Sequence, residues 1–244
     1  MAFAIGYNVS KANELMANIV EAFKNLEIYT QQQWVPLKDK LRAHWVGEDE
    51  QDFEKKLVDR LLQLYESSYQ LTASCVNTIA GLAQTWYEFQ KTNTIDGGVS
   101  EFAGNLKPTI PVVTKNPQLL TFTPFTIDVN ADRGLQSATS GSTIQASMSQ
   151  FIGDIRTKTN GLFEEIQTNN AFFGEQTQTI KAYVEKVGYA IGEVTVAVKD
   201  MYDELSRLAF SSYTGATENV STQFNEISGQ VESSLDELGQ SRWS

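Results

Sequence analysis

A run of almost entirely apolar residues at unbroken three- and four-residue spacing constrains this sequence more than any other feature. The run consists of Phe53, Leu57, Leu61, Leu64, Ser68, Leu71, Cys75, Ile79, Leu82, Trp86 and Phe89. Residues spaced in this way share one face of an α-helix, because the helix turns once every 3.6 residues or so. The run therefore predicts one helix of about forty residues, roughly 60 Å long, with a coiled-coil seam.

The preceding stretch, from Ser10 to His44, predicts a second helix that pairs with the first. Its apolar face is formed by Ile19, Phe23, Leu26, Leu37, Leu41 and Trp45. Pro36 is a candidate position for a kink, because its ring clashes with the preceding turn and it has no amide hydrogen. We expect residues 1–93 to form a first helical hairpin.

Helical spacing stops near Asn93, and residues 94–141 differ in composition from the rest of the chain. This segment is rich in Gly, Pro, Thr and Val and holds four of the five prolines. Residues 110–113 and 119–129 are β-branched and aromatic runs separated by turn-forming residues, which favours a β-hairpin. The segment is predicted to be a connector that contains a small β-hairpin.

Helical spacing resumes near Ser142. Ser142 and Gln145 have the separation of a capping box, which predicts a helix start at this point. Apolar stripes follow on both sides of a break near Asn169, and a last stripe occupies residues 220–238. Residues 142–244 are predicted to form a second helical hairpin and a C-terminal helix. The expected fold class is mainly α, with two long antiparallel hairpins in a coiled-coil-like bundle.

The turn between the first two predicted helices reads His-Trp-Val-Gly-Glu-Asp-Glu from His44 to Glu50. Gly47 can adopt the left-handed geometry that ends a helix, and Trp45 can cover the open end of the seam. The acids after Gly47 stand at the positive end of the next helix dipole, where they stabilise it. With its flanking helices, this turn resembles the WXG100 (ESAT-6-like) family, which consists of small helical hairpins with a Trp-x-Gly turn.

The WXG100 resemblance covers residues 10–93. It implies a hairpin that dimerises and leaves bacteria through a specialised secretion system. The family's export signal is a tyrosine followed four residues later by an acid, just after the second helix. Here Lys91 follows Tyr87 at that spacing, so the signal is not met.

A similar turn occurs 127 residues later, at Phe172, Phe173 and Gly174. The same offset pairs Phe53 with Ile180 and further apolar positions of the two long helices with each other. The helices before the two turns do not align. A tandem duplication and two separately heptad-patterned hairpins therefore both remain open.

Residues that common catalytic and metal sites require are scarce. The single histidine, His44, and the single cysteine, Cys75, leave no Cys/His metal cluster. About 28 residues of helix separate Cys75 from the turn, roughly 40 Å, which is too far for a dyad with His44. No glycine-rich phosphate-binding pattern occurs, and adjacent acids such as Glu164 and Glu165 diverge around their helix. We predict a protein that is not an enzyme, with no catalytic residue, cofactor or metal, and interpret Cys75 as a core residue.

Composition limits the partners and the location of the chain. A formal net charge of −11 disfavours nucleic acid and anionic membranes as partners. No apolar run is long enough for a transmembrane helix, and the first residues lack the basic and apolar segments of a signal peptide. The location stays unknown, with leaderless secretion and inclusion in a virus particle as the two expectations.

The favoured function is structural. The apolar stripes are longer than one hairpin can shield, so they are expected to pack against the second hairpin or against another subunit. The expected partner is the chain itself or another helical protein, in an oligomer or a larger assembly. Candidate interaction residues lie at the hairpin ends, where large aromatic side chains favour partner contacts. They are Trp45, Gly47, Trp86, Phe172 and Gly174.

Two settings and one different class remain as alternatives. The settings are a WXG100-like secreted component and a structural component of a phage particle, such as a capsid or tail accessory protein. The different class is an α-helical pore-forming toxin with residues 109–129 as a β-tongue. Polar residues such as Lys115, Asn116 and Asp128 interrupt that tongue and disfavour the toxin.

Overall fold

The computed structural model describes residues 7–93, 107–116, 120–126, 134–135 and 138–208. Within these residues the long helices are α1 (Val9–His44), α2 (Glu48–Asn93), α4 (Ala138–Thr168) and α5 (Thr177–Leu208). A 3-10 helix, η1 (Asn170–Gln176), joins α4 to α5. The strands β1 (Trp45–Val46) and β2 (Gly134–Leu135) form one short antiparallel pair. The predicted mainly α class is confirmed.

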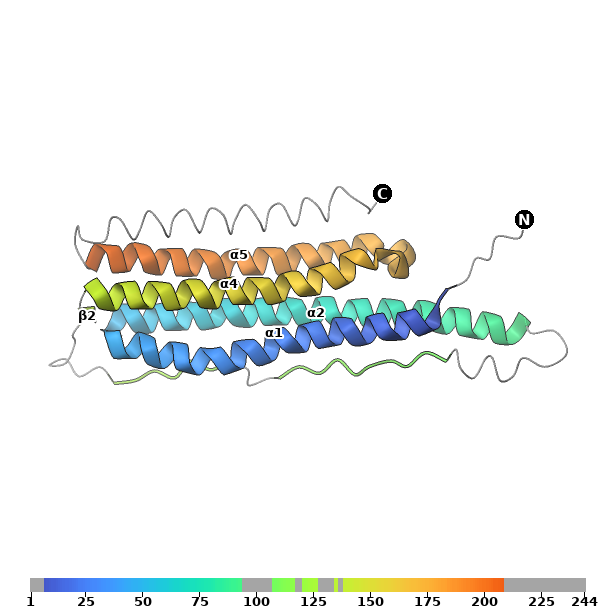
Figure 1. Ribbon diagram of the computed structural model, residues 1–244, viewed down its shortest axis with the longest axis horizontal. Helices are drawn as coiled ribbons and strands as arrows, with labels where there is room; N and C mark the ends of the chain where they lie inside the picture. Colours follow the sequence, from blue (N-terminus) through green and yellow to red (C-terminus); the bar gives the residue numbers. More distant parts are fainter. Residues whose placement is uncertain (1–6, 94–106, 117–119, 127–133, 136–137, 209–244) are drawn as a thin grey trace.

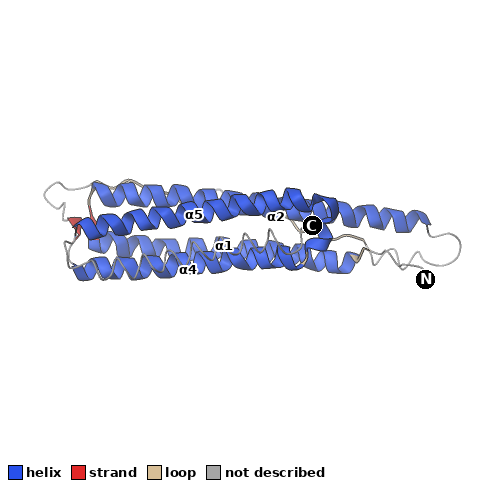
Figure 2. Ribbon diagram, turned by 90° about the horizontal axis from the view of Figure 1, so that it is seen from above, coloured by secondary structure: helices blue, strands red, loops and turns tan. Residues whose placement is uncertain are grey.

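The four α-helices lie side by side in an elongated bundle (Figure 1). The helix α1 packs against α2 and α4, and α2 also packs against α5 along its length. From above, α2 and α5 lie along one side of the bundle and α1 and α4 along the other (Figure 2). Neighbouring helices run in opposite directions (Figure 1). Every helix therefore has an antiparallel neighbour on two sides and turns one face to the common centre.

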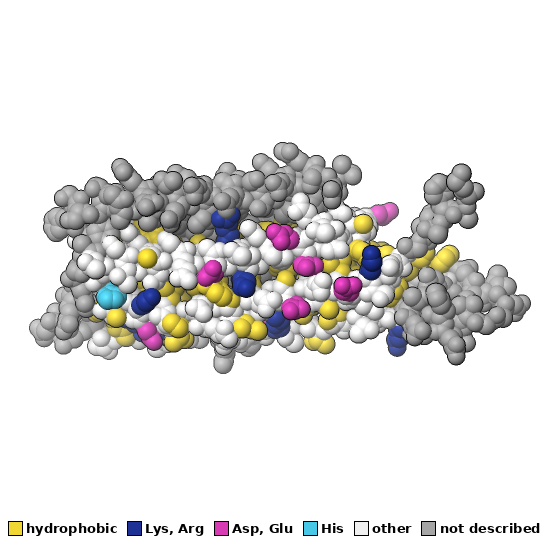
Figure 3. Space-filling model, in the orientation of Figure 1, with side chains coloured by type: hydrophobic (Ala, Val, Ile, Leu, Met, Phe, Trp, Pro, Cys, Tyr) yellow, Lys and Arg dark blue, Asp and Glu magenta, His cyan; other side chains and the backbone are white. Residues whose placement is uncertain are grey.

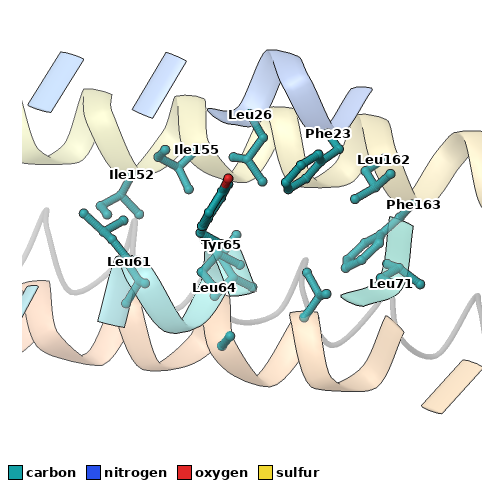
Figure 4. Close-up of a cluster of buried hydrophobic side chains, with 14 of the residues drawn as sticks. Phe23, Leu26, Leu61, Leu64, Tyr65, Leu71, Ile152, Ile155, Leu162 and Phe163 are labelled. Atoms are coloured by element: carbon teal, nitrogen blue, oxygen red, sulfur yellow. The ribbon is translucent and has the colours of Figure 1, made fainter. Parts of the chain in front are cut away.

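The apolar stripes of the sequence meet in the centre of this bundle. Figure 4 shows Phe23 and Leu26 of α1, Leu61 of α2 and Ile155 of α4 pointing toward one another. These four side chains are at most 2% exposed. Burying a side chain of this size contributes roughly 1.5–3 kcal/mol relative to leaving it in water. The predicted use of these stripes as a helix–helix core is thus confirmed.

The length of α2 is also close to the prediction. It has 46 residues, which corresponds to about 69 Å. The helix α1 begins after Asn8, whose side chain accepts a hydrogen bond from the amide of Lys11 (3.0 Å), and it continues through Pro36. No described helix combines the length and the apolar character that crossing a lipid bilayer would require.

The predicted start of the third long helix was wrong by one turn. The helix α4 begins at Ala138, so Ser142 and Gln145 lie inside it and do not form a capping box at its start. Gln145 is almost fully buried, and its carbonyl accepts a hydrogen bond from the Tyr202 hydroxyl (2.8 Å). The small residues 138–141 carry no apolar periodicity, but they tolerate helical geometry once the following turns are packed.

The predicted β-hairpin of the connector is absent from the described residues. Residues 107–116 and 120–126 form no strand, and the one strand pair joins β1 to β2. Three prolines within these ranges cannot donate a strand hydrogen bond, which explains why the β-branched runs do not pair. Residues 117–119 and 127–133 of the predicted hairpin lie outside the described residues, as does the predicted last helix.

The connector instead follows the groove between α1 and α2. The amide of Thr109 donates to Asn13 Oδ1 (2.9 Å), and Lys24 Nζ donates to the carbonyl of Thr114 (3.1 Å). Figure 1 shows this segment running along the bundle toward the end where α4 begins. Side chains of the helices thus supply the hydrogen bonds that a neighbouring strand would have supplied.

Candidate functional site at the ends of the bundle

One end of the bundle holds the turn between α1 and α2. The side chain of Trp45 is 1% exposed and stacks on Phe53 with 5.9 Å between ring centroids. Gly47 is buried, and Gly174 is the only described glycine with a positive φ. The left-handed geometry predicted for Gly47 is therefore wrong. The chain leaves α1 in extended geometry at Trp45, whose backbone pairs with Leu135, and this pairing closes the turn.

Arg42 joins three segments at this end. Its Nε and Nη2 atoms donate to the two carboxylate oxygens of Glu54, each at 2.8 Å, and Nη2 also donates to the carbonyl of Thr123 (3.3 Å). The guanidinium lies 4.4 Å from the ring centroid of Phe125. Gln51 Nε2 donates to the Phe125 carbonyl (2.7 Å). A two-bond Arg–carboxylate pair fixes direction as well as distance, so α1, α2 and the connector are held in one arrangement.

Glu50 lies one helical turn before Glu54 and is fully buried. Neither of its carboxyl oxygens has a hydrogen-bond donor in the described structure. Burial, and then the negative charge of Glu54, raises the pKa of Glu50 to about 8, although Arg42 acts in the opposite direction. Glu50 therefore carries its proton at neutral pH, and its hydroxyl can donate to Glu54.

This raised pKa predicts that stability declines with rising pH. Folded Glu50 keeps a proton that the unfolded chain releases above its ordinary value of 4.5, so the unfolding free energy should fall between about pH 5 and pH 8 and then level off. In Glu50→Gln this decline should be smaller, and near pH 8.5 the variant should be more stable than wild type by about 2–4 kcal/mol. Urea titrations at several pH values measure both effects. Glu48→Gln, at an exposed position, is the control; equal declines in Glu50→Gln and wild type would contradict the prediction.

The opposite end holds the turn between α4 and α5. The hydroxyl of Tyr7 lies within hydrogen-bonding distance of the carbonyls of Phe172 (3.3 Å) and Ile79 (3.4 Å). The rings of Tyr7 and Phe172 meet edge to face, 5.4 Å apart, and Phe173 is fully buried. Gly174 has φ 53° and ψ −132°, a backbone conformation that side chains with a Cβ rarely adopt. The turn at this end does depend on its glycine.

Gly174→Ala should destabilise the protein by about 1 kcal/mol, because alanine is strained at this φ. A Cβ there would lie 3.5 Å from Leu82 Cδ1, which is an ordinary van der Waals contact. The loss of stability is therefore expected to come from backbone strain and not from a steric clash. Gly161→Ala is a matched control, because its Cβ would enter open space within α4 and should stabilise the helix by about 0.5–1 kcal/mol. Thermal unfolding distinguishes the two; a Gly174→Ala variant as stable as Gly161→Ala would refute the assignment.

Beyond this turn, α2 extends past the described parts of the other helices. Leu82 faces Gly174, and the helix extends from there to Asn93, roughly three further turns. Figure 1 shows this end of α2 projecting past η1. Trp86 is half-buried and contacts the edge of Phe89 with 5.7 Å between centroids. Phe89 is 57% exposed, although it is a large aromatic residue on the apolar face of α2.

The predicted interaction residues thus divide between two ends. Trp45 and Gly47 lie at one end and are buried, whereas Trp86, Phe172 and Gly174 lie near the other. The chain matches no family model, no curated protein and no solved structure. The WXG100 resemblance of residues 10–93 stays a prediction.

The long face formed by α1 and α4 has a different character. Figure 3 shows polar and charged side chains spread over this face, with only small hydrophobic patches between them. A groove of about 650 Å³ between the two helices is lined mostly by polar residues, among them Asn18, Asn25, Thr157 and Glu164. Within the described residues, no group of three or more His, Cys, Asp or Glu side chains is arranged to hold a metal ion.

Sequence reasoning missed the cluster of Arg42, Glu50 and Glu54. A signal was present, because Glu50 and Glu54 continue the apolar stripe of α2 backward from Leu57 at the same three- and four-residue spacing. Two acids on the apolar face of a helix are expected to be buried and therefore to need a partner. The partner itself, Arg42, could not be identified until the register between α1 and α2 was known.

Proposed function

We propose that this chain is a structural protein without enzymatic activity, which assembles with further copies of itself through the projecting end of α2. The observation that carries the proposal is the exposed continuation of a core face. The stripe that is buried at Ile79 (0% exposed) runs on through Leu82 and Trp86 to Phe89, which is 57% exposed. Exposed aromatic side chains that continue a helix-packing stripe favour contact with another helix.

In a symmetric contact between two such ends, each residue–residue interaction would occur twice. In a two-fold symmetric dimer the same surface contributes from both copies, so Trp86 and Phe89 of one copy would meet the same residues of the other. Aromatic residues in the centre of an interface often dominate its binding energy. The proposed interface is therefore the aromatic end of α2, together with the neighbouring α4–α5 turn.

The biological setting that we propose for this protein is suggested by the WXG100 resemblance of residues 10–93. The WXG100 resemblance supports a bacterial secreted component built from helical hairpins, with α1–α2 as the first hairpin and α4–α5 as the second. The alternative setting is a structural component of a phage particle. Both settings require a protein that acts through helix–helix contacts, which is the function proposed here.

Light scattering coupled to size-exclusion chromatography tests the proposal. The wild-type mass should exceed the 27.2 kDa of one chain and rise with concentration. The double variant Trp86→Gln, Phe89→Gln should elute as a single chain with unchanged helicity. Tyr189→Gln on α5, whose tyrosine is 63% exposed, is a matched control and should behave as wild type. A wild-type protein that stays at 27.2 kDa at every concentration, or a control that dissociates equally, would contradict the proposal.

A further inference from the structure

The two described parts of the connector are held in different ways. Residues 107–116 are held by Asn13, by Lys24, which also pairs with Glu27 at 2.8 Å, and by Tyr65 and Glu66 of α2, which bond to Asn116 and Lys115. Residues 120–126 are held by Gln51, which donates to the Phe125 carbonyl, and by Arg42, which belongs to a buried cluster with Glu54 and Glu50. Only the second part is therefore connected to a buried carboxyl group that has no donor.

We propose that Glu50, Glu54 and Arg42 form a proton-dependent latch that holds residues 120–126 against α1 and α2. This inference does not depend on self-assembly. In the closed state Glu50 is protonated and donates to Glu54, while Arg42 donates twice to Glu54 and once to the Thr123 carbonyl. The cluster then contains one negative and one positive charge and is neutral overall.

Release of the Glu50 proton to solvent changes this balance. The buried carboxylates of Glu50 and Glu54 then share the single guanidinium of Arg42, and their like charges repel each other. Glu50 also becomes a competing acceptor for Arg42. The longest of the Arg42 bonds, 3.3 Å to the Thr123 carbonyl, is the one that a competing carboxylate displaces. Loss of this bond and of the guanidinium contact frees the Phe125 ring to turn outward, while Gln51 still donates to the Phe125 carbonyl.

The groups around Glu50 set the pH at which the latch opens. The charged neighbours that act on it are Glu54 of α2 and Arg42 of α1. The described residues of β1 and of the connector at this end, Trp45, Val46 and residues 120–126, include no titratable side chain. Burial and Glu54 outweigh Arg42 and raise the pKa of Glu50 to about 8, so opening is expected between about pH 7 and pH 9.

Hydroxyl-radical footprinting of the full chain tests the latch. Oxidation of Phe125 is measured relative to oxidation of Ile110, which lies in the part of the connector without the latch and is 54% exposed. Between about pH 6.5 and pH 9 this ratio should rise at least about threefold in wild type, as Glu50 passes from mostly protonated to mostly ionised. Glu50→Gln, which cannot ionise, should keep the low ratio at both pH values.

Two controls make the outcome decisive. Glu48→Gln changes an exposed acid in the same helical turn and should respond to pH as wild type does. Circular dichroism at both pH values should show unchanged helicity, which separates release of the connector from unfolding. A constant ratio in wild type, or an equal rise in Glu50→Gln, would overturn the proposal.

Discussion

Replacing Arg42 by alanine is expected to lower the free energy of unfolding by about 3–5 kcal/mol, the cost of removing one partner of a buried ion pair. Glu54 is fully buried and would lose both hydrogen bonds from Arg42. Its neighbour Glu50 is also an acid and cannot replace the lost positive charge. The connector would lose its bond at Thr123 as well. Urea unfolding near neutral pH, followed by circular dichroism, measures the effect.

Arg60→Ala provides the matched control. Arg60 pairs with Glu193 at 3.0 Å, but both side chains are partly exposed, at 37% and 23%. Exposed ion pairs contribute little, so this variant should lose less than about 1 kcal/mol. Equal losses in Arg42→Ala and Arg60→Ala would show that the buried cluster has no special part in stability.

Trp45→Ala is expected to cost about 3–5 kcal/mol, as large aromatic-to-alanine changes in a core do. The ring is 1% exposed and packs on Phe53. Because Trp45 lies at the end opposite to the projecting part of α2, the folded variant should still self-associate. Thermal unfolding and light scattering measure the two properties separately.

The comparison for Trp45 is Trp86→Ala. Trp86 is half-buried near the projecting end of α2, so its loss should cost less than about 1.5 kcal/mol in stability but weaken association. Trp45→Ala is thus expected to lose stability and keep self-association, whereas Trp86→Ala is expected to keep most of its stability and show weaker self-association. A Trp45→Ala protein that is folded yet dissociated, with Trp86→Ala unaffected in mass, would reverse the assignment of the two ends.

The helices could be predicted from the sequence because each signal is repeated many times. The stripe from Phe53 to Phe89 repeats over about ten helical turns, so single exceptions such as Ser68 do not hide it. The position of α1 and most of the length of α2 followed from this repetition, although α2 begins at Glu48, before the first residue of the stripe. Single-residue signals were less reliable: Gly47 was expected to be left-handed, but strand pairing at Trp45 closes that turn.

The connector and the buried cluster depended on information that a local pattern does not contain. The β-branched runs of residues 110–113 and 119–129 have strand composition. The described backbone in and beside them nevertheless bonds to side chains of α1 and α2 far away in the sequence, at Thr109, Thr114, Thr123 and Phe125. Arg42 and Glu54 meet because of the register between two helices. Periodicity predicts which face of a helix is buried, but it does not predict which residues lie opposite each other.

Thiol cross-linking at the end of α2 tests the proposed assembly most directly. Thr85→Cys places a reactive thiol on the exposed surface one turn before Phe89, whereas the native Cys75 is buried, and burial raises the pKa of its thiol. A short bis-maleimide should join Thr85→Cys chains into dimers, and adding Trp86→Gln and Phe89→Gln should abolish the product. Ala146→Cys, exposed on α4, should give little dimer. Equal cross-linking at positions 85 and 146, or a dimer that persists without the two aromatic side chains, would contradict assembly through this end.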